Sequence, residues 1–205
     1  MEQRFKTKQC TGIGMLSGKD LERIGELIYD TDPYIYPAIF ETQEKARRII
    51  PLLIESRKDN MFCYENLYLI YKDSEIVGVI LWHKGPLEYK SECLFDMAVQ
   101  YGIKQDNVKV TVEQYFDSYK NQEQEVISVI NVCIHKQYRH QGIGSYILRE
   151  FIKEHYNEKL ELYTLADNKC AVNLYSKYDF QIIKEQKGFS LDENKPYCFQ
   201  MVRYL

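Results

Sequence analysis

A glycine-rich turn between a strand-like run and a helix-like run is the part of the sequence best suited to chemistry. Residues 132–145 read VCIHKQYRHQGIGS, with Gly142 and Gly144 placed where the helical pattern begins. Two glycines permit positive backbone φ angles and let a ligand approach the main chain closely. The exposed N–H groups of such a turn, together with the helix dipole, form an anion site suited to a pyrophosphate. The same spacing is equally typical of a turn that needs glycine for packing alone, so both interpretations stay open.

Two other phosphate-binding motifs do not fit the sequence. A dinucleotide-binding GxGxxG would need glycine three residues after Gly144, where Ile147 stands. A P-loop ending at Gly18-Lys19 would need glycine at Ile13, and Ser or Thr where Asp20 stands. We therefore expect neither a dinucleotide-binding fold nor a P-loop fold.

The 18 tyrosines are unusual, because one of their phenols could act as an acid. With a reference pKa of about 10, a phenol stays protonated at neutral pH and can donate to a leaving thiolate of pKa about 8.5. Catalytic roles are rare, so most of these tyrosines are expected to pack in the core. Composition alone assigns chemistry to none of them.

Cysteines and histidines form no pattern that predicts a metal site. The six cysteines are scattered without a CxxC pair: Cys10, Cys63, Cys93, Cys133, Cys170 and Cys198. The four histidines give no HExxH, and the spacing of His135 and His140 puts no pair on one helical face. We therefore expect no metal, and free thiols in a reducing cytoplasm rather than disulfides.

Composition and charge exclude several classes of protein. The 205 residues are 45% hydrophobic and 28% charged, which is typical of one globular domain over 1–205. The net charge of −3 comes without a basic block, so nucleic acid is not an expected partner. Residues 1–8 are polar and lack the apolar core of a signal peptide, and no apolar run is long enough to cross a membrane. These features predict a cytoplasmic protein without a membrane partner.

The N-terminal part of the chain predicts two helices and a hairpin. A capping pattern at Ser17 and Asp20 opens a helix near 18–30, and a second helical stretch runs through Ala46 and Leu53. Pro51 marks a kink or a fresh start in that stretch. Between the two helices, 31–40 is a turn-rich segment dense in aromatic residues. Strand-like runs at 67–71 and 76–82, joined by a short polar turn, predict the hairpin.

The remainder of the chain predicts a mixed α/β domain. Residues 84–124 carry a short helix at 91–100 and a capping box that opens another at Thr111. The β-branched run at 126–134 is typical of a central strand buried on both faces. After the glycine turn we expect a helix that packs back on the sheet, a strand at 160–165, a helix at 171–177 and strands at 180–184 and 197–202.

Two motifs in this part of the chain resemble those of the GCN5-related N-acetyltransferase (GNAT) superfamily. VCIHxxYRxxGIG over 132–144 is similar to the superfamily's acyl-CoA signature, and NxxAxxLYxKxDF over 168–180 is similar to its second motif. The resemblance covers about 126–184 and implies the GNAT fold, with 84–124 as a helical insertion beyond the usual core. Asp179 stands where the family usually has glycine, and Asp tolerates left-handed backbone angles better than most residues.

The resemblance also implies acetyl-CoA as cosubstrate and a set of residues that hold it. The strand at 132–134 would splay from its neighbour and hydrogen-bond the pantetheine arm, and the turn after Arg139 would hold the pyrophosphate. The implied cofactor-binding residues are Val132, Cys133, Ile134, Arg139, His140, Gln141, Gly142, Ile143, Gly144, Ser145 and Asn168. A strand N–H near Ile134 would contact the oxyanion.

The resemblance further implies that Tyr175 is the general acid, since it occupies the family's usual position for that group. The acceptor side of the fold is usually lined by the first two helices and the loop between them, so Tyr34 and Tyr36 are candidate substrate residues. The general base is left open among water and five side chains, which are Asp32, Glu41, Asp96, Glu125 and His135.

We therefore predict an enzyme that moves an acetyl group from acetyl-CoA to a primary amine of a small molecule or peptide by direct attack. An alternative is a non-catalytic CoA-binding sensor or interaction module on the same fold. A homodimer is possible, since dimers are frequent in the family. The identity of the amine is not determined by the sequence.

Overall fold

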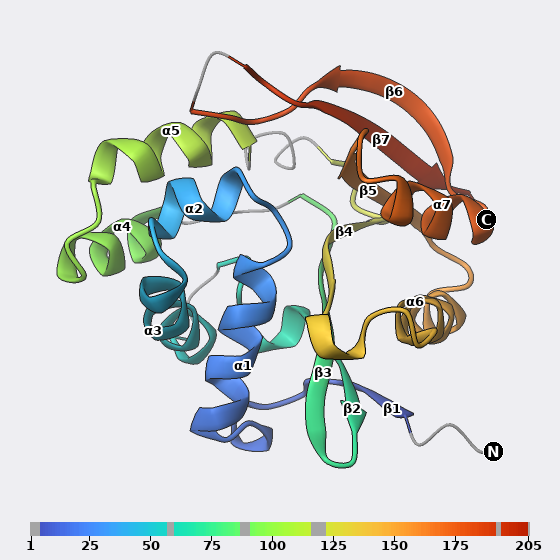
Figure 1. The fold of residues 1–205 in the computed structure, drawn as a ribbon, viewed down its shortest axis with the longest axis horizontal. Coiled ribbons are helices and arrows are strands. Elements are labelled where there is room, and N and C mark those ends of the chain that lie inside the picture. The colour runs from blue at the N-terminus through green and yellow to red at the C-terminus, as the bar shows by residue number, and fades with distance from the viewer. Residues whose placement is uncertain (1–4, 57–59, 87–90, 116–121, 192–193, 205) are drawn as a thin grey trace.

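The computed structural model describes residues 5–56, 60–86, 91–115, 122–191 and 194–204 of the chain. Its strands form one mixed sheet in the order β1-β2-β3-β4-β5-β7-β6 (Figure 1). The strands are β1 Phe5–Gln9, β2 Leu67–Lys72, β3 Glu75–Lys84, β4 Val126–Ile134, β5 Lys159–Leu165, β6 Gln181–Lys187 and β7 Tyr197–Arg203. Only the β4–β5 pair is parallel among these described strands, and the other neighbours run antiparallel.

Helices cover both faces of the sheet. They are α1 Gly18–Tyr29, α2 Ile35–Phe40, α3 Gln43–Glu55, α4 Ser91–Gln100, α5 Gln105–Tyr115, α6 Ile143–Glu154 and α7 Lys169–Lys177. Figure 1 shows α1, α2 and α3 on one side of β4 and α6 on the other. Alternate residues of β2 divide between two buried clusters: Leu67 and Leu69 face α1–α5, whereas Tyr68 and Ile70 face α6 and α7. The central strands are therefore buried on both faces, as the run at 126–134 predicted.

Most of the predicted strands and helices are confirmed. The capping box of α1 is present, with the Ser17 side chain and the Asp20 side chain each accepting the other's backbone N–H. The β2–β3 hairpin turns through Asp73 and Ser74, both at positive φ. The substitution of Asp179 for glycine is also explained, because Asp179 has φ +66°.

The prediction that 31–40 is only turn-rich was wrong, because α2 occupies its second half. The Asp32 carboxylate accepts hydrogen bonds from the N–H groups of Tyr34 and Ile35 and thereby opens the helix. Pro37 lies in the first turn of α2, where its missing N–H costs no helical hydrogen bond.

Of the two alternatives predicted for Pro51, a fresh start is excluded, because helix α3 runs through it as one element. Two other elements differ from the sequence-based prediction. Helix α5 begins at Gln105, so Thr111 is not a cap: its hydroxyl donates to the Asn107 carbonyl in the preceding turn. Strand β1 was not predicted, because its sequence FKTKQ is polar and lies at the sheet edge, where one exposed face is tolerated.

The cysteines whose side chains are described are all free thiols, with Cys10 and Cys133 buried. The side chain of Cys93 lies outside the described residues. Across the described ranges, no helix is long and apolar enough to cross a membrane.

Candidate functional site

Strands β4 and β5 part midway along their length. Their pairing runs from Val126↔Lys159 to Val129↔Leu162 and then stops. On the other side of β4 the register with β3 shifts at the same level, from Leu81↔Asn131 to Trp82↔Val129. This leaves Ile130 as the extra residue of a bulge, and bulges bend the strand that carries them. The second half of β4 thus remains paired with β3 while its other edge opens into a cleft.

The backbone of Val132 and Ile134 faces this open edge. The N–H of His135 donates to the Val77 carbonyl on β3 at 2.9 Å. Because backbone groups of successive strand residues point to alternate edges, those of Cys133 also face β3 and those of Val132 and Ile134 face the cleft. The Ile134 carbonyl accepts a hydrogen bond from Arg139 Nε at 2.9 Å, which ties the following turn to the strand end.

The glycine turn presents the N-terminus of α6 to the same cleft. Gly142 is the N-cap at φ +78°, and His140 is also at positive φ, +60°. The first intrahelical bond runs from the Tyr146 N–H to the Gly142 carbonyl. The N–H groups of Ile143, Gly144 and Ser145 therefore have no partner within the helix, and the helix dipole makes this end positive.

These elements enclose a cleft of about 420 Å³. Ten of the eleven predicted cofactor-binding residues line it: Val132, Cys133, Ile134, Arg139, His140, Gly142, Ile143, Gly144, Ser145 and Asn168. Gln141 does not line the cleft, because its exposed side chain turns back and donates to the Gln137 carbonyl.

The surroundings of Gly144 favour the ligand interpretation of the glycine turn over the packing one. A Cβ at this position would lie 3.5 Å from Leu174 Cδ2 and 3.9 Å from Ile134 Cγ1, which are ordinary contacts. A side chain would therefore fit the protein itself, and what the glycine keeps clear is the space of the cleft. At Gly142 the positive φ is itself a reason for glycine.

Gly78 on β3 is a positioning residue that the sequence analysis missed. A Cβ there would lie 2.6 Å from Ile134 Cδ1 and 2.8 Å from the Cys133 carbonyl, so no side chain fits without moving β4. An isolated glycine inside a strand-like run often marks such a close approach, and this was the available signal.

Asn168 and Tyr175 bring α7 to the cleft. Asn168 caps the helix, with its side-chain oxygen accepting the Ala171 N–H at 3.1 Å. Tyr175 is 7% exposed and packs its ring against Phe180. Burial raises the pKa of the Tyr175 phenol above its ordinary value, and the nearby Cys133 adds to the increase, so the phenol stays protonated at neutral pH. Within the described part of the chain no hydrogen-bond partner is found for its hydroxyl.

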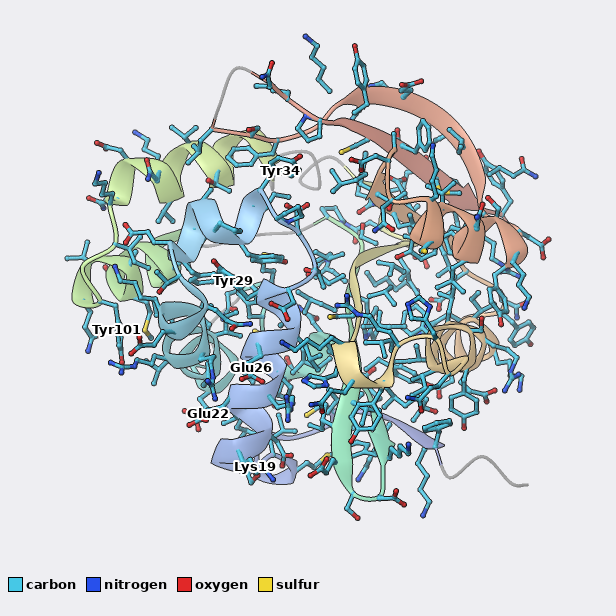
Figure 2. The ribbon with its side chains drawn as sticks, viewed as in Figure 1. Lys19, Glu22, Glu26, Tyr29, Tyr34 and Tyr101 are labelled. Atoms are coloured by element: carbon cyan, nitrogen blue, oxygen red, sulfur yellow. The ribbon has the colours of Figure 1, made fainter. Side chains whose placement is uncertain are left out.

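A smaller pocket of about 90 Å³ adjoins the cleft on the α2 side. The two share five lining residues, which are Thr31, Val132, Asn168, Ala171 and Tyr175. Of the predicted substrate residues, Tyr36 lines this pocket and Tyr34 lines neither space. Figure 2 shows Tyr34 at the start of α2. Phe189 and Cys198 also line the pocket, and nothing in their local sequence distinguished them.

A chain of hydrogen bonds fixes the loop after α1 against the bulge of β4. The Tyr36 hydroxyl donates to Asn131 Oδ1, and Asn131 Nδ2 donates to the Thr31 hydroxyl, both at 2.6 Å. Tyr36 and Asn131 are buried, at 1% and 7% exposure. Since unpaired buried polar groups are costly, this chain specifies where the loop lies.

The structure separates the five candidate bases. Asp32 alone among them lines the pocket. Glu41 is paired with Lys45 at 2.6 Å, Glu125 is paired with Lys84 at 3.0 Å, and Asp96 is exposed on α4. His135 lines neither space.

The carboxylates of α1 are also engaged away from the pocket. Figure 2 shows Glu22 and Glu26 along this helix. Arg47 of α3 pairs with both, and Arg23 pairs with Glu26 at 2.9 Å.

Comparison with known proteins agrees with this geometry. Residues 103–182 match the sequence model of the acetyltransferase (GNAT) domain, and a search of curated proteins finds no relative. An N-acetyltransferase from Staphylococcus aureus Mu50 superposes with a TM-score of 0.66 at 13% identity, covering 97% of this chain and 100% of its own.

Two more solved structures share the fold. Arabidopsis thaliana Naa50, in complex with the bisubstrate analogue CoA-Ac-MVNAL, has a TM-score of 0.58 at 13% identity and covers 98% of this chain and 99% of its own. The ribosomal-protein-S18-alanine N-acetyltransferase from Escherichia coli has a TM-score of 0.55 at 11% identity, with coverages of 97% and 92%. The chain therefore shares the fold of these acetyltransferases, and its residues 103–182 match the GNAT domain model.

Proposed function

We propose that the protein is an N-acetyltransferase that moves the acetyl group of acetyl-CoA to a primary amine by direct attack. The observation that carries this proposal is the cleft, where the open edge of β4 and the N-terminus of α6 face one space that reaches Tyr175. An open strand edge is suited to the amides of a pantetheine arm, and a helix N-terminus is suited to a pyrophosphate.

Different residues of the cleft would bind different parts of the cosubstrate. The N–H groups of Ile143, Gly144 and Ser145 would bind the pyrophosphate, with Gly142 and Arg139 shaping the turn. The edge of β4 would bind the pantetheine arm through Val132 and Ile134. Val132 lines both the cleft and the pocket, and we assign its N–H as the donor to the thioester oxygen. The sequence-based prediction put this donor near Ile134, two residues further along the same edge.

Tyr175 would act where the cleft meets the pocket. The amine attacks the thioester carbon, the C–S bond breaks, and the leaving thiolate takes the phenolic proton. The attacking nitrogen loses a proton as the amide forms, and this proton returns the phenolate to the phenol. The hydroxyl of this buried tyrosine, for which no hydrogen bond is found among the described residues, would donate to the sulfur.

The acceptor is a primary amine of a small molecule or peptide. A peptide amine draws support from two of the similar structures, one solved with a peptide-bearing bisubstrate analogue and one named for alanine of a ribosomal protein. In this chain the acceptor would enter through the pocket beside Tyr36.

Binding and turnover measured together test the proposal. Millimolar acetyl-CoA should raise the melting temperature, because a ligand that binds only the native state stabilises it. The protein should then release CoA thiol from acetyl-CoA when offered a panel of alkylamines, polyamines, amino acids and peptides with free N-termini. Absence of any stabilisation by acetyl-CoA would overturn the proposal. Stabilisation without thiol release from any amine would favour the non-catalytic CoA-binding module instead.

A further inference from the structure

The Asp32 side chain lines the small pocket, and only one of its two carboxylate oxygens accepts hydrogen bonds from the described residues. Its Oδ1 accepts two hydrogen bonds, from the N–H of Tyr34 at 2.7 Å and the N–H of Ile35 at 2.8 Å. These bonds open α2 and fix the carboxyl group in place. Both bonds go to one oxygen, and no described residue bonds to Oδ2, which leaves that oxygen for another partner. The residue is half-buried and lines the pocket.

The charge of Asp32 has no counter-charge in the described part of the protein. No Lys, Arg or His is among the residues that line the pocket, and the described residues form no ion pair with Asp32. Burial raises the pKa of this carboxyl above its ordinary value, although the two N–H groups lower it. A desolvated carboxylate without a cationic partner is costly, and a cationic ligand would remove that cost.

The position of the pocket indicates what that cation is. Thr31, next to Asp32, lines both the pocket and the cleft, and so do Val132 and Tyr175. A group held at Asp32 thus lies beside the space assigned to the thioester. A cavity of about 150 Å³ holds the six carbon atoms of benzene, so the pocket of about 90 Å³ admits about four non-hydrogen atoms, an amine nitrogen and about three carbons. The rest of the acceptor must lie outside.

We propose that Asp32 binds the ammonium group of the acceptor and takes its proton, which makes the nitrogen a nucleophile. This inference rests on the proposed function and adds to it the acceptor's charge and its anchor. The proton passes from the ammonium nitrogen to Asp32 Oδ2. The free amine then attacks the thioester carbon, the C–S bond breaks and the thiolate leaves with the Tyr175 proton. The proton that the nitrogen loses as the amide forms restores the Tyr175 phenol, and Asp32 releases its proton to water after the amide departs.

The other titratable groups that line the pocket are three tyrosines and one cysteine. Tyr36 faces it from α2, Tyr163 from β5, Tyr175 from α7 and Cys198 from β7. Burial raises the pKa values of Tyr163 and Tyr175, and it raises that of Cys198 to about 11. The charges of Asp32 and Asp167 add to the increase at Cys198. Asp32 is therefore the pocket group whose charge changes between acidic and neutral pH.

The substitution Asp32→Asn removes the charge of this side chain and keeps its ability to accept the two hydrogen bonds that open α2. The amide oxygen of Asn can still accept from Tyr34 and Ile35, so the fold is retained while the counter-charge is lost. Asp32→Ala removes both and should also lower the melting temperature. Glu185→Gln, at an exposed position of β6, makes the same change in net charge away from the pocket.

The probes are n-butylamine, which is cationic at neutral pH, and 1-butanol, which is its neutral counterpart of similar shape. With CoA saturating, calorimetry should detect binding of n-butylamine, and not of 1-butanol, to the wild type and to Glu185→Gln. In Asp32→Asn the amine should bind no better than the alcohol. With acetyl-CoA, kcat/KM for n-butylamine should fall by about 10²-fold in Asp32→Asn, while the dissociation constant of CoA is unchanged.

The two proposals fail in distinguishable ways. Equal amine binding and equal kcat/KM in the wild type and Asp32→Asn would overturn the role of Asp32 and leave the acetyltransferase intact. Failure of n-butylamine to bind the wild-type CoA complex would overturn it as well. CoA binding without thiol release from any amine would instead count against the proposed function, and the calorimetric comparison would still decide whether Asp32 holds an ammonium group.

Discussion

The cleft and the pocket meet at Tyr175, but they are built from different parts of the polypeptide. The cleft is made mainly of backbone: the open edge of β4 and the first turn of α6, both within 130–146. The pocket is made of side chains from separate parts of the chain, which are Thr31–Tyr36, β4, β5, α7, Phe189 and β7. A ligand in the cleft contacts mainly backbone N–H groups, whereas a ligand in the pocket contacts side chains particular to this chain.

This difference predicts which substitutions each region tolerates. Side chains can change around the cleft as long as the backbone path and the space beside it are kept. In the pocket, single side chains decide charge and size, because Asp32 supplies the carboxylate and the Tyr36–Asn131–Thr31 chain fixes the loop that carries it. A substitution in the cleft should therefore impair CoA binding, and one in the pocket should impair use of the acceptor without changing CoA binding. The following substitutions test this expectation.

The largest effect is expected at the cleft, from Gly144→Glu. A carboxylate at the first turn of α6 would oppose the pyrophosphate, and such like-charge contacts cost several kcal/mol, which is about 10²-fold or more in affinity. The stabilisation by CoA in thermal melts should disappear. Gly18→Glu is the matched control, because a Cβ there meets nothing within 4 Å and the site lies at the start of α1. Retention of CoA binding in Gly144→Glu would refute the assignment of the turn.

The junction of the two regions is tested by Tyr175→Phe. Loss of the acid should lower kcat by about 10²-fold while CoA binds as before. The melting temperature should change little, since the hydroxyl has no hydrogen-bond partner in the described structure. Tyr156→Phe, at a tyrosine that is 65% exposed, controls for the loss of a phenol. An unchanged kcat would show that the thiolate leaves without this proton.

On the pocket side, Tyr36→Phe should act through the loop. It leaves the buried Asn131 Oδ1 without its donor, so the free energy of unfolding should fall by about 1–3 kcal/mol. In urea denaturation Tyr34→Phe, two residues away and outside both spaces, should lose less stability. The acceptor KM should rise in Tyr36→Phe with no change in CoA affinity. Weaker CoA binding would mean that the two regions are coupled.

The smallest effect is the pH dependence of stability at Asp32. Its pKa is raised above the ordinary value of 3.8 in the folded protein, so the folded state binds more protons than the unfolded state just above that pH. The wild type should therefore lose stability as pH rises through this window, by about 1 kcal/mol or less. Asn does not titrate. In thermal melts the melting temperature of Asp32→Asn, relative to that of the wild type, should therefore rise between acidic and neutral pH. A difference that does not vary with pH would mean that the carboxyl is not desolvated.

The sequence predicted the fold wherever a single pattern dominated a segment. The β-branched run of β4 and the glycine turn gave both the central strand and the helix that follows it. Prediction failed where a side chain acted through a distant or unexpected partner. Asp32 opens α2 inside a segment that reads as turn, and Thr111 resembles a cap although its hydroxyl bonds to the turn before it. The polar β1 has no hydrophobic alternation, and its pairing with β2 is what makes it a strand.

The same contrast holds for function. The sequence by itself predicted the strand, the turn and the helix around Gly142–Ser145, and the resemblance of residues 168–180 implied Tyr175 as the candidate acid. Only the tertiary structure decided that Asp32, rather than four other candidates, lies in the pocket, and that Phe189 and Cys198 complete it. A pocket made of side chains from segments far apart in the chain exists only after the sheet has assembled and the loop at 31–36 has been fixed against the bulge of β4.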